Sequence, residues 1–462
     1  MFPDESQTGL FFTKFCTYKL LVKKSYIRLQ LCFVFVMPLQ LHAMPWETVA
    51  NISGLLQSKP AEHNMHAACS YFHKHTPRTR VHLEINTLYM RDPLEQQDRI
   101  HRLVRRYKQV HNKIAFGITM RGMPENWAPV LLQQFTDMFP EEPLVSLRLR
   151  LSVDYIAAGN APDFVSRLTD LEDLDLNDSD IYAFPEHYLE NLGLQSLVIG
   201  NSTRQNFRDN MLVNPFPTFI AGLRALVKLD ISHFFYGTTF ITHDDEEDPI
   251  PFAHLTALTY LNFAGNECLV VPPNITLLTN LQHLDLSDNN LESVDMDFSV
   301  FVHMTSLRIS VHNWFDETPP VQLDNSVCDM PSLQHLDLNG LHLSSLPQNI
   351  GRLTQLVCLD ISNSSLQDLP DSFTLMCGLV TLNAENIECE FIPEKIGLCA
   401  NLENFNWALN SLSHIPASFV HLHKLRHVRL LFDELIQSEM SPAVVAHCAQ
   451  LMGMGCVFSH VQ

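Results

Sequence analysis

The chain has 462 residues, a formal net charge of −21 at pH 7, and 18% charged residues. Its length allows two or three ordinary domains or one elongated repeat array. The acidic balance excludes the usual nucleic-acid-binding protein, whose surface carries a basic footprint.

Residues 1–43 form an extension whose role the sequence leaves open. Basic residues precede an apolar run at 29–41, which is too short to cross a bilayer as a helix. The run has the length of a signal-peptide core, but it starts late and lacks a small-residue cleavage site. Three interpretations remain: a disordered segment, a membrane or export segment, or a true start at Met37 or Met44.

The cysteines indicate the cellular compartment. All 11 are scattered singly, and several, such as Cys268 and Cys399, fall at apolar repeat positions, where a thiol packs as a small hydrophobe. This distribution is typical of a reducing compartment, so we expect a cytoplasmic protein. Asn-x-Ser/Thr triplets, such as those at Asn51 and Asn274, and the N-terminal run leave secretion as the alternative.

Residues 44–79 predict a short helical segment. Pro45 suits a first helical turn, and Val49, Ile52 and Leu56 make an apolar stripe at helical spacing. On these residues alone, the segment is an ordinary helical cap of the repeats that follow.

The same segment resembles an F-box, a family that begins Leu-Pro-x-Glu and closes on a Val-Cys-x-x-Trp-like element. Here Met replaces the leading Leu, Phe replaces the Trp, and the closing element comes one residue late. The matching residues are Met44, Pro45, Glu47, Ile52, Leu56, Ala68, Cys69 and Phe72. The resemblance implies that a Skp-type adaptor protein would bind this segment by helix-in-groove packing. The implied adaptor-binding residues are Pro45, Glu47, Val49, Ile52 and Leu56.

A long repeat array follows, which we place at 80–432. Its first part contains three predicted strands, 81–85, 114–119 and 144–151, spaced about 30 residues apart. Between the first two strands, apolar residues recur at helical spacing. This pattern predicts strand–helix units.

From Leu171 onward the repeats become regular. Leading leucines recur every 23 residues in segments such as "LQHLDLNGLHLSSLPQNIGRL" at 333–353. This sequence pattern resembles that of the leucine-rich repeat family. The predicted fold is therefore α/β: a curved solenoid with a parallel sheet on its concave side, because each repeat needs stacked neighbours to bury its apolar face. Residues 433–462 predict a helix and a last strand that close the stack.

The family's buried asparagine is only partly kept. It is present as Asn266, Asn289 and Asn410, whereas Leu341 and Ile387 stand at positions where no side-chain hydrogen bond is possible. We expect less regular stacking at these two positions.

Together the two resemblances predict the substrate-recognition subunit of a cullin–RING (Skp–cullin–F-box) ubiquitin ligase. Bacterial effectors also use this architecture inside a eukaryotic host, where the location would be the host cytosol. The alternative is a leucine-rich repeat scaffold or binding protein with no link to a ubiquitin ligase.

Neither catalysis nor a cofactor is expected. A glycine-rich phosphate loop is missing from the sequence, and the Cys-x-Asp at 358–360 lies within a predicted repeat strand. The acidic insertion at 243–249 lacks the pattern of a calcium loop. The histidines of "HLHKLRH" at 421–427 would be split between two faces by strand alternation, so no metal site is predicted.

The strand pattern also predicts a protein-binding face. Side chains on either side of the central strand leucine point off the sheet, and those that directly follow this leucine are mostly Asp or Asn. We expect this acidic stripe to bind an unknown protein substrate that carries a basic patch, partly by electrostatic steering. The candidate residues are Asp175, Asp230, Tyr260, Asn262, His283, Asp285, His335, Asp337, Asp360, Asn383 and Asn406.

Overall fold

The computed structural model describes the repeats in most detail, in two units that divide at residue 194. The described residues are the strands before residue 152, and 163–177, 184, 188–189, 193–200, 218–234, 252–311, 321, 323–432, 440–453 and 457–460. For the strands before residue 152, the description is of the backbone.

The first unit contains an antiparallel hairpin and a parallel ladder. Its strands are β1 (Phe15–Val22), β2 (Ser25–Cys32), β3 (Thr79–Asn86), β4 (Ile114–Met123), β5 (Leu144–Leu151) and β6 (Asp173–Asp175), with a 3₁₀ helix at Asp163–Arg167. The pairs β1–β2 and β2–β3 are antiparallel, and β3 to β6 pair in parallel. The three predicted strands are confirmed as β3, β4 and β5. The hairpin within 1–43 was not predicted, and the helix expected between β3 and β4 lies outside the described residues.

The second unit is a ladder of parallel strands that pair in chain order, as predicted. These strands are β7 (Ser196–Val198), β8 (Lys228–Asp230), β9 (Tyr260–Asn262), β10 (His283–Asp285), β11 (Ser306–Arg308), β12 (His335–Asp337), β13 (Cys358–Asp360), β14 (Thr381–Asn383), β15 (Asn404–Trp407), β16 (His427–Phe432) and β17 (Val457–His460). Their pairing is parallel throughout.

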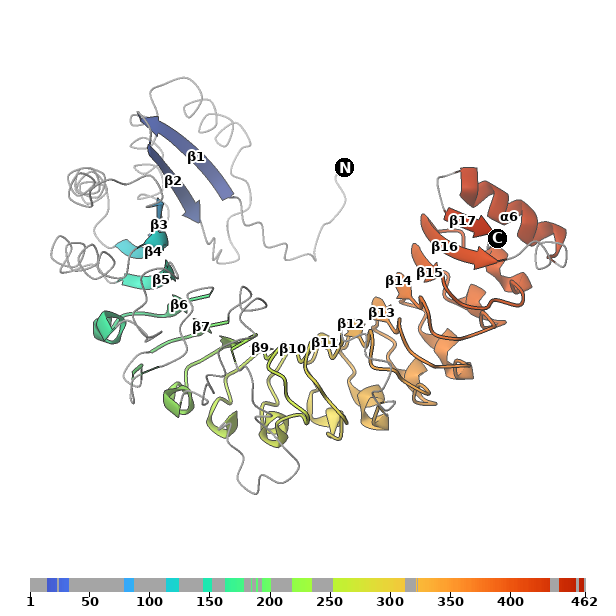
Figure 1. The fold of residues 1–462 in the computed structure, drawn as a ribbon, viewed down its shortest axis with the longest axis horizontal. Coiled ribbons are helices and arrows are strands. Elements are labelled where there is room, and N and C mark those ends of the chain that lie inside the picture. Colours follow the sequence, from blue (N-terminus) through green and yellow to red (C-terminus); the bar gives the residue numbers. More distant parts are fainter. Residues whose placement is uncertain are drawn as a thin grey trace, which may run out of the picture. The chain divides into compact units, whose positions relative to one another are not determined.

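Short 3₁₀ helices return the chain from one strand to the next. They span Thr218–Gly222, Phe252–His254, Pro273–Leu277, Phe298–Val300, Asn325–Asp329, Ile350–Arg352, Asp371–Leu375, Ile396–Leu398 and Ala417–His421. In this unit the strands lie along the inner side of an arc and the 3₁₀ helices along its outer side (Figure 1). Asp297 and Asp324 cap two of the helices, accepting hydrogen bonds from the backbone N–H of Ser299 and Ser326.

The core of this unit is a stack of leucines. In a strand such as His283–Asp285 the central residue points inward and its two neighbours point outward, because side chains alternate along a strand. Leu284, Leu336 and Leu359 are each at most 1% exposed. Truncation of one such leucine to alanine removes apolar packing worth about 2–5 kcal/mol.

The predicted helix and last strand are present at the C-terminal end. Helix α6 spans Pro442–Gly453 and buries Val444, Cys448 and Leu451. This spacing places the three side chains on one helical face, and β17 then adds to β16 in parallel. Among the described helices, none is long and apolar enough to span a lipid bilayer.

The asparagines form the expected buried ladder. Asn266, Asn289 and Asn410 are at most 7% exposed, and the side chain of each donates to backbone carbonyls of its own and the preceding repeat.

The expectation of less regular stacking at Leu341 and Ile387 was wrong. The register β12–β13–β14–β15 is unbroken. The N–H of Ile387 donates to Oδ1 of Asn410 at 2.8 Å, and the N–H of Leu341 donates to a carbonyl of its own repeat. Both side chains are buried. Neighbouring repeats and local turns therefore satisfy the backbone where the family's asparagine is missing.

Candidate functional site

The exposed side of the second unit's sheet carries two columns of aligned side chains. The first-position column holds the first residue of each strand from β8 to β16, and the third-position column holds the third residue. In pairing order, the third-position column is Asp230, Asn262, Asp285, Arg308, Asp337, Asp360, Asn383, Asn406 and Arg429. The first-position column is Lys228, Tyr260, His283, Ser306, His335, Cys358, Thr381, Asn404 and His427. The candidate residues of the second unit therefore share one face, whereas Asp175 lies in the first unit, paired with Arg148 of β5.

Each acidic residue of the third-position column has a structural task that the sequence did not reveal. Oδ1 of Asp230 accepts from the N–H of Ser232, and Oδ1 of Asp285 accepts from the N–H of Ser287, at 3.2 and 3.0 Å. Asp337 and Asp360 accept from the residue two positions later in the same way. Such local bonds hold the turn that follows the strand. The available signal was the recurring sequence Asp-x-Ser, with Asn339 in the place of Ser after Asp337.

Arg308 bridges two of these carboxylates. Its Nη1 lies 3.2 Å from Oδ2 of Asp285, and its Nε lies 3.3 Å from Oδ2 of Asp337. Burial lowers the pKa of Arg308, but the two carboxylates outweigh that effect and raise it. Burial raises the pKa of Asp337, and the nearby Asp360 adds to the rise while Arg308 opposes it. The positive charge of Arg308 therefore partly neutralises the predicted acidic stripe.

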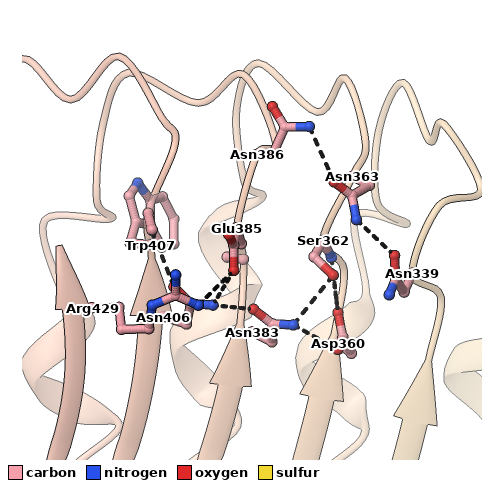
Figure 2. A network of polar contacts seen from close by, with 12 residues as sticks. Asn339, Asp360, Ser362, Asn363, Asn383, Glu385, Asn386, Asn406, Trp407 and Arg429 are labelled. Atoms are coloured by element: carbon pink, nitrogen blue, oxygen red, sulfur yellow. Dashed lines mark hydrogen bonds and ion pairs between the residues drawn. The ribbon is translucent and has the colours of Figure 1, made fainter. Parts of the chain in front are cut away.

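A second network covers β13 to β16 (Figure 2). Nδ2 of Asn383 donates to Oδ2 of Asp360 at 2.7 Å, and Nδ2 of Asn406 donates to Oδ1 of Asn383 at 2.8 Å. Glu385 accepts from Asn406 and also from Nη1 of Arg429 at 3.1 Å. The sequence did not single out Glu385, because it lies two residues beyond the column. The side chains of this part of the face are therefore joined to one another by hydrogen bonds.

A shorter amide ladder runs beside that network, also visible in Figure 2. Nδ2 of Asn363 donates to Oδ1 of Asn339, and Nδ2 of Asn386 donates to Oδ1 of Asn363, at 3.0 and 3.1 Å. The ladder fixes the turns at the strand ends of β12 to β14.

An aromatic cluster lies at the other end of the face, on β8 to β10. Nζ of Lys228 lies 5.1 Å from the ring centroid of Tyr260. The ring of His283 lies 5.9 Å from that of Tyr260, tilted by 48°. Burial raises the pKa of Tyr260, and Asp230 and Asp285 add to the rise, so its phenol stays neutral near pH 7. Tyr260 and His283 were predicted as partner-binding residues of this face.

The predicted adaptor-binding residues fall outside the part of the chain that the structure describes. Pro45, Glu47, Val49, Ile52 and Leu56 all lie outside the described residues, as does the acidic insertion at 243–249.

The other predicted chemistry can be examined directly. Cys358 and Asp360 lie on β13, and burial together with Asp360 raises the pKa of the Cys358 thiol. A raised pKa opposes formation of the nucleophilic thiolate. In the described part of the chain, no three His, Cys, Asp or Glu side chains are grouped as metal ligands would be. His423 instead faces the ring of His447 at 6.3 Å.

Comparison with known families identifies the repeats. Residues 319–457 match the family model described as a leucine-rich repeat region. A solved leucine-rich repeat protein of Leptospira interrogans aligns with a TM-score of 0.50 at 17% identity, covering 82% of this chain and 89% of that chain. This likeness shows the fold. The chain therefore contains a leucine-rich repeat region and has the leucine-rich repeat fold, in which stacked repeats form an extended concave surface.

Two curated proteins share part of the sequence. The adenylate cyclase of Schizosaccharomyces pombe is 33% identical over 114 residues, which is 24% of this chain and 6% of the cyclase. The receptor-like protein EIX1 of Solanum lycopersicum is 34% identical over 110 residues, or 22% of this chain and 10% of that protein. The chain therefore spans a tenth or less of either relative.

Proposed function

We propose that this protein binds another polypeptide on the concave face formed by β8 to β16. One observation carries the proposal: two columns of polar side chains stay in register across these parallel strands and point outward from a leucine core. Many of these side chains are already fixed by hydrogen bonds and ion pairs. A preorganised surface loses little conformational freedom on binding.

The partner's binding surface is basic in this proposal. The acids of the face are Asp230, Asp285, Asp337, Asp360 and Glu385, and its fixed-charge bases are Lys228, Arg308 and Arg429. An excess of acids remains after the internal pairs are counted. Such a field steers a positively charged partner and weakens as salt screens it.

The test uses the partner recovered with the full chain from extract of the cells that express it. Asp285→Asn, Asp337→Asn and Asp360→Asn together remove the charge but keep an oxygen that can accept the turn hydrogen bond. The expected result is weaker binding and a shallower salt dependence than in the wild type. The control neutralises three exposed acids outside the columns, Asp295, Asp329 and Asp371. Equal losses in both triple variants would contradict a specific role for the face.

We propose further that the protein is the substrate-recognition subunit of a Skp–cullin–F-box ubiquitin ligase, with the location and partners that this implies: the cytosol, or a host cytosol for an effector, and a Skp-type adaptor. The support is the F-box-like spacing of Pro45, Glu47, Ile52 and Leu56 directly ahead of leucine-rich repeats. In this role the chain carries no catalysis of its own. The second candidate function is a leucine-rich repeat binding protein without a ligase link, which the repeats alone support.

A pull-down with a purified Skp-type adaptor separates the two. The double variant Pro45→Ala, Leu56→Asp removes one apolar contact and places a charge in the other, so adaptor capture should be lost while concave-face binding persists. Capture that survives the double change, or that never occurs with the wild type, removes the F-box assignment and leaves the binding-protein function.

A further inference from the structure

We propose that the ring of Tyr260 and the carboxylate of Asp230 form a subsite for one lysine or arginine side chain of the partner. In the free protein, Lys228 occupies the face of the ring. The inference rests on the proposed function, because it names what one part of the concave face recognises.

The first argument is the bonding capacity of the carboxylates. Oδ2 of Asp285 and Oδ2 of Asp337 both accept from Arg308. Oδ2 of Asp360 accepts from Asn383. Asp230 differs from these three. Its Oδ1 accepts two hydrogen bonds from Ser232, one from the N–H at 3.2 Å and one from Oγ at 2.8 Å. Among the described residues, no side chain donates to Oδ2 of Asp230. This oxygen can therefore accept a hydrogen bond from a partner.

The second argument is the aromatic ring beside it. Tyr260 pairs with Lys228 of β8 in register, and Asp230 pairs with Asn262 of β9. Neighbouring strands lie about 4.8 Å apart, so the ring and the carboxylate sit on adjacent strands of one exposed face. The Nζ of Lys228 at 5.1 Å from the ring centroid shows that the ring accepts a cation from this side.

The third argument is that Lys228 can be displaced. Its side chain is exposed, and a cation–π contact at an exposed site is weak. Within the described part of the chain, Lys228 makes no ion pair with a carboxylate. A partner's guanidinium or ammonium that reaches both the ring and Oδ2 of Asp230 makes two interactions where Lys228 makes one. The partner's cation therefore replaces the resident one.

The experiment selects binders from a random linear dodecapeptide phage library on the immobilised full chain. Synthetic copies of the selected peptides are then titrated against the wild type and single variants. Peptides should carry a lysine or arginine at a recurring position. Asp230→Asn keeps an Oδ1 acceptor for Ser232, as Asn262 does for Ala264 at 3.1 Å, and should weaken binding about tenfold.

Two further variants change affinity in opposite directions. Tyr260→Leu keeps apolar bulk but removes the ring face, and should weaken binding about two- to fivefold. Lys228→Met removes the resident cation and should strengthen binding by a similar factor. Asp371→Asn removes the same unit of charge from a 3₁₀ helix outside the columns and serves as the control. A merely structural role for Lys228 would not produce tighter binding on its removal.

The outcomes separate this inference from the proposed function. Selected peptides without a basic residue, peptides that bind Asp230→Asn as tightly as the wild type, or weaker binding to Lys228→Met would each overturn the subsite. The proposed function fails differently. Ser306→Trp blocks the middle of the concave face, and peptides that still bind this variant normally would show that the face is not the binding surface.

Discussion

Asn289 accepts a hydrogen bond at its Oδ1 from the backbone N–H of Asn266 at 3.0 Å, one repeat of 23 residues earlier. The same oxygen accepts from the N–H of Cys268 at 3.1 Å, and Nδ2 of Asn289 donates to the carbonyls of Phe263 and Leu286. One buried amide therefore links two repeats and satisfies four backbone groups.

Replacing this amide should destabilise the second unit strongly. Asn289→Ala leaves buried backbone groups without partners, and we expect a loss of about 2–4 kcal/mol in the free energy of unfolding. Urea unfolding followed by circular dichroism measures the change. Asn349 is exposed and makes no capping bond with its side chain, so Asn349→Ala should stay within about 0.5 kcal/mol of the wild type. Similar losses in both variants would show that the ladder is not important.

Gly340 marks a place where no side chain fits. Its φ is +75°, and an added Cβ would lie 2.0 Å from the carbonyl oxygen of Val311. Gly340→Ala should therefore destabilise the repeat by about 2 kcal/mol or more, through backbone strain and a clash. At Gly453, nothing lies within 4 Å of an added Cβ, and Gly453→Ala should be nearly neutral. A fully stable Gly340→Ala protein would require a different turn between β12 and β13.

The carboxyl of Asp337 should titrate above its ordinary pKa. Burial is the largest cause, and Arg308 opposes it. Because the folded pKa is raised, the stability that Asp337 contributes is present at low pH and is lost as the pH rises from about 3.8 through the folded value. Removing the opposing cation with Arg308→Met should raise the pKa further. Carboxylate chemical shifts followed through a pH titration by NMR test the direction. A downward shift in Arg308→Met would contradict the bridge.

The buried cysteines should resist alkylation. Burial raises the pKa of Cys268 and Cys399 to about 12, whereas Cys377 is exposed. At pH 8, iodoacetamide should modify Cys377 rapidly and the two buried thiols only after unfolding in urea, as read by peptide mass spectrometry. Rapid labelling of Cys268 in the native protein would mean that its repeat opens.

Much of the fold could be predicted because the leucines of successive repeats recur at a fixed spacing in the sequence. The strand leucines, the asparagines at 266, 289 and 410, and the register of Asp285, Asp337 and Asp360 all follow from spacing. Side-chain alternation then fixes which residues face outward.

The pairings across the face could not be predicted in the same way. Arg308 interrupts the acidic column in the sequence, yet in the structure it bridges Asp285 and Asp337. Glu385 joins Asn406 and Arg429 from a position outside the column. Such contacts depend on rotamers and on the distance between repeats, which a linear pattern does not encode. The F-box-like residues lie outside the described part of the chain, so that assignment stays a prediction.

Site-specific photo-cross-linking tests the central claim most directly. The photoreactive amino acid benzoylphenylalanine replaces either Ser306, in the middle of the concave face, or Leu398, which is exposed on a 3₁₀ helix of the outer side. Irradiation in the cells that express the full chain should give a covalent adduct with a second polypeptide from position 306 and none from position 398. Adducts from position 398 alone would show that the partner binds the outer side, and the concave-face account would be wrong.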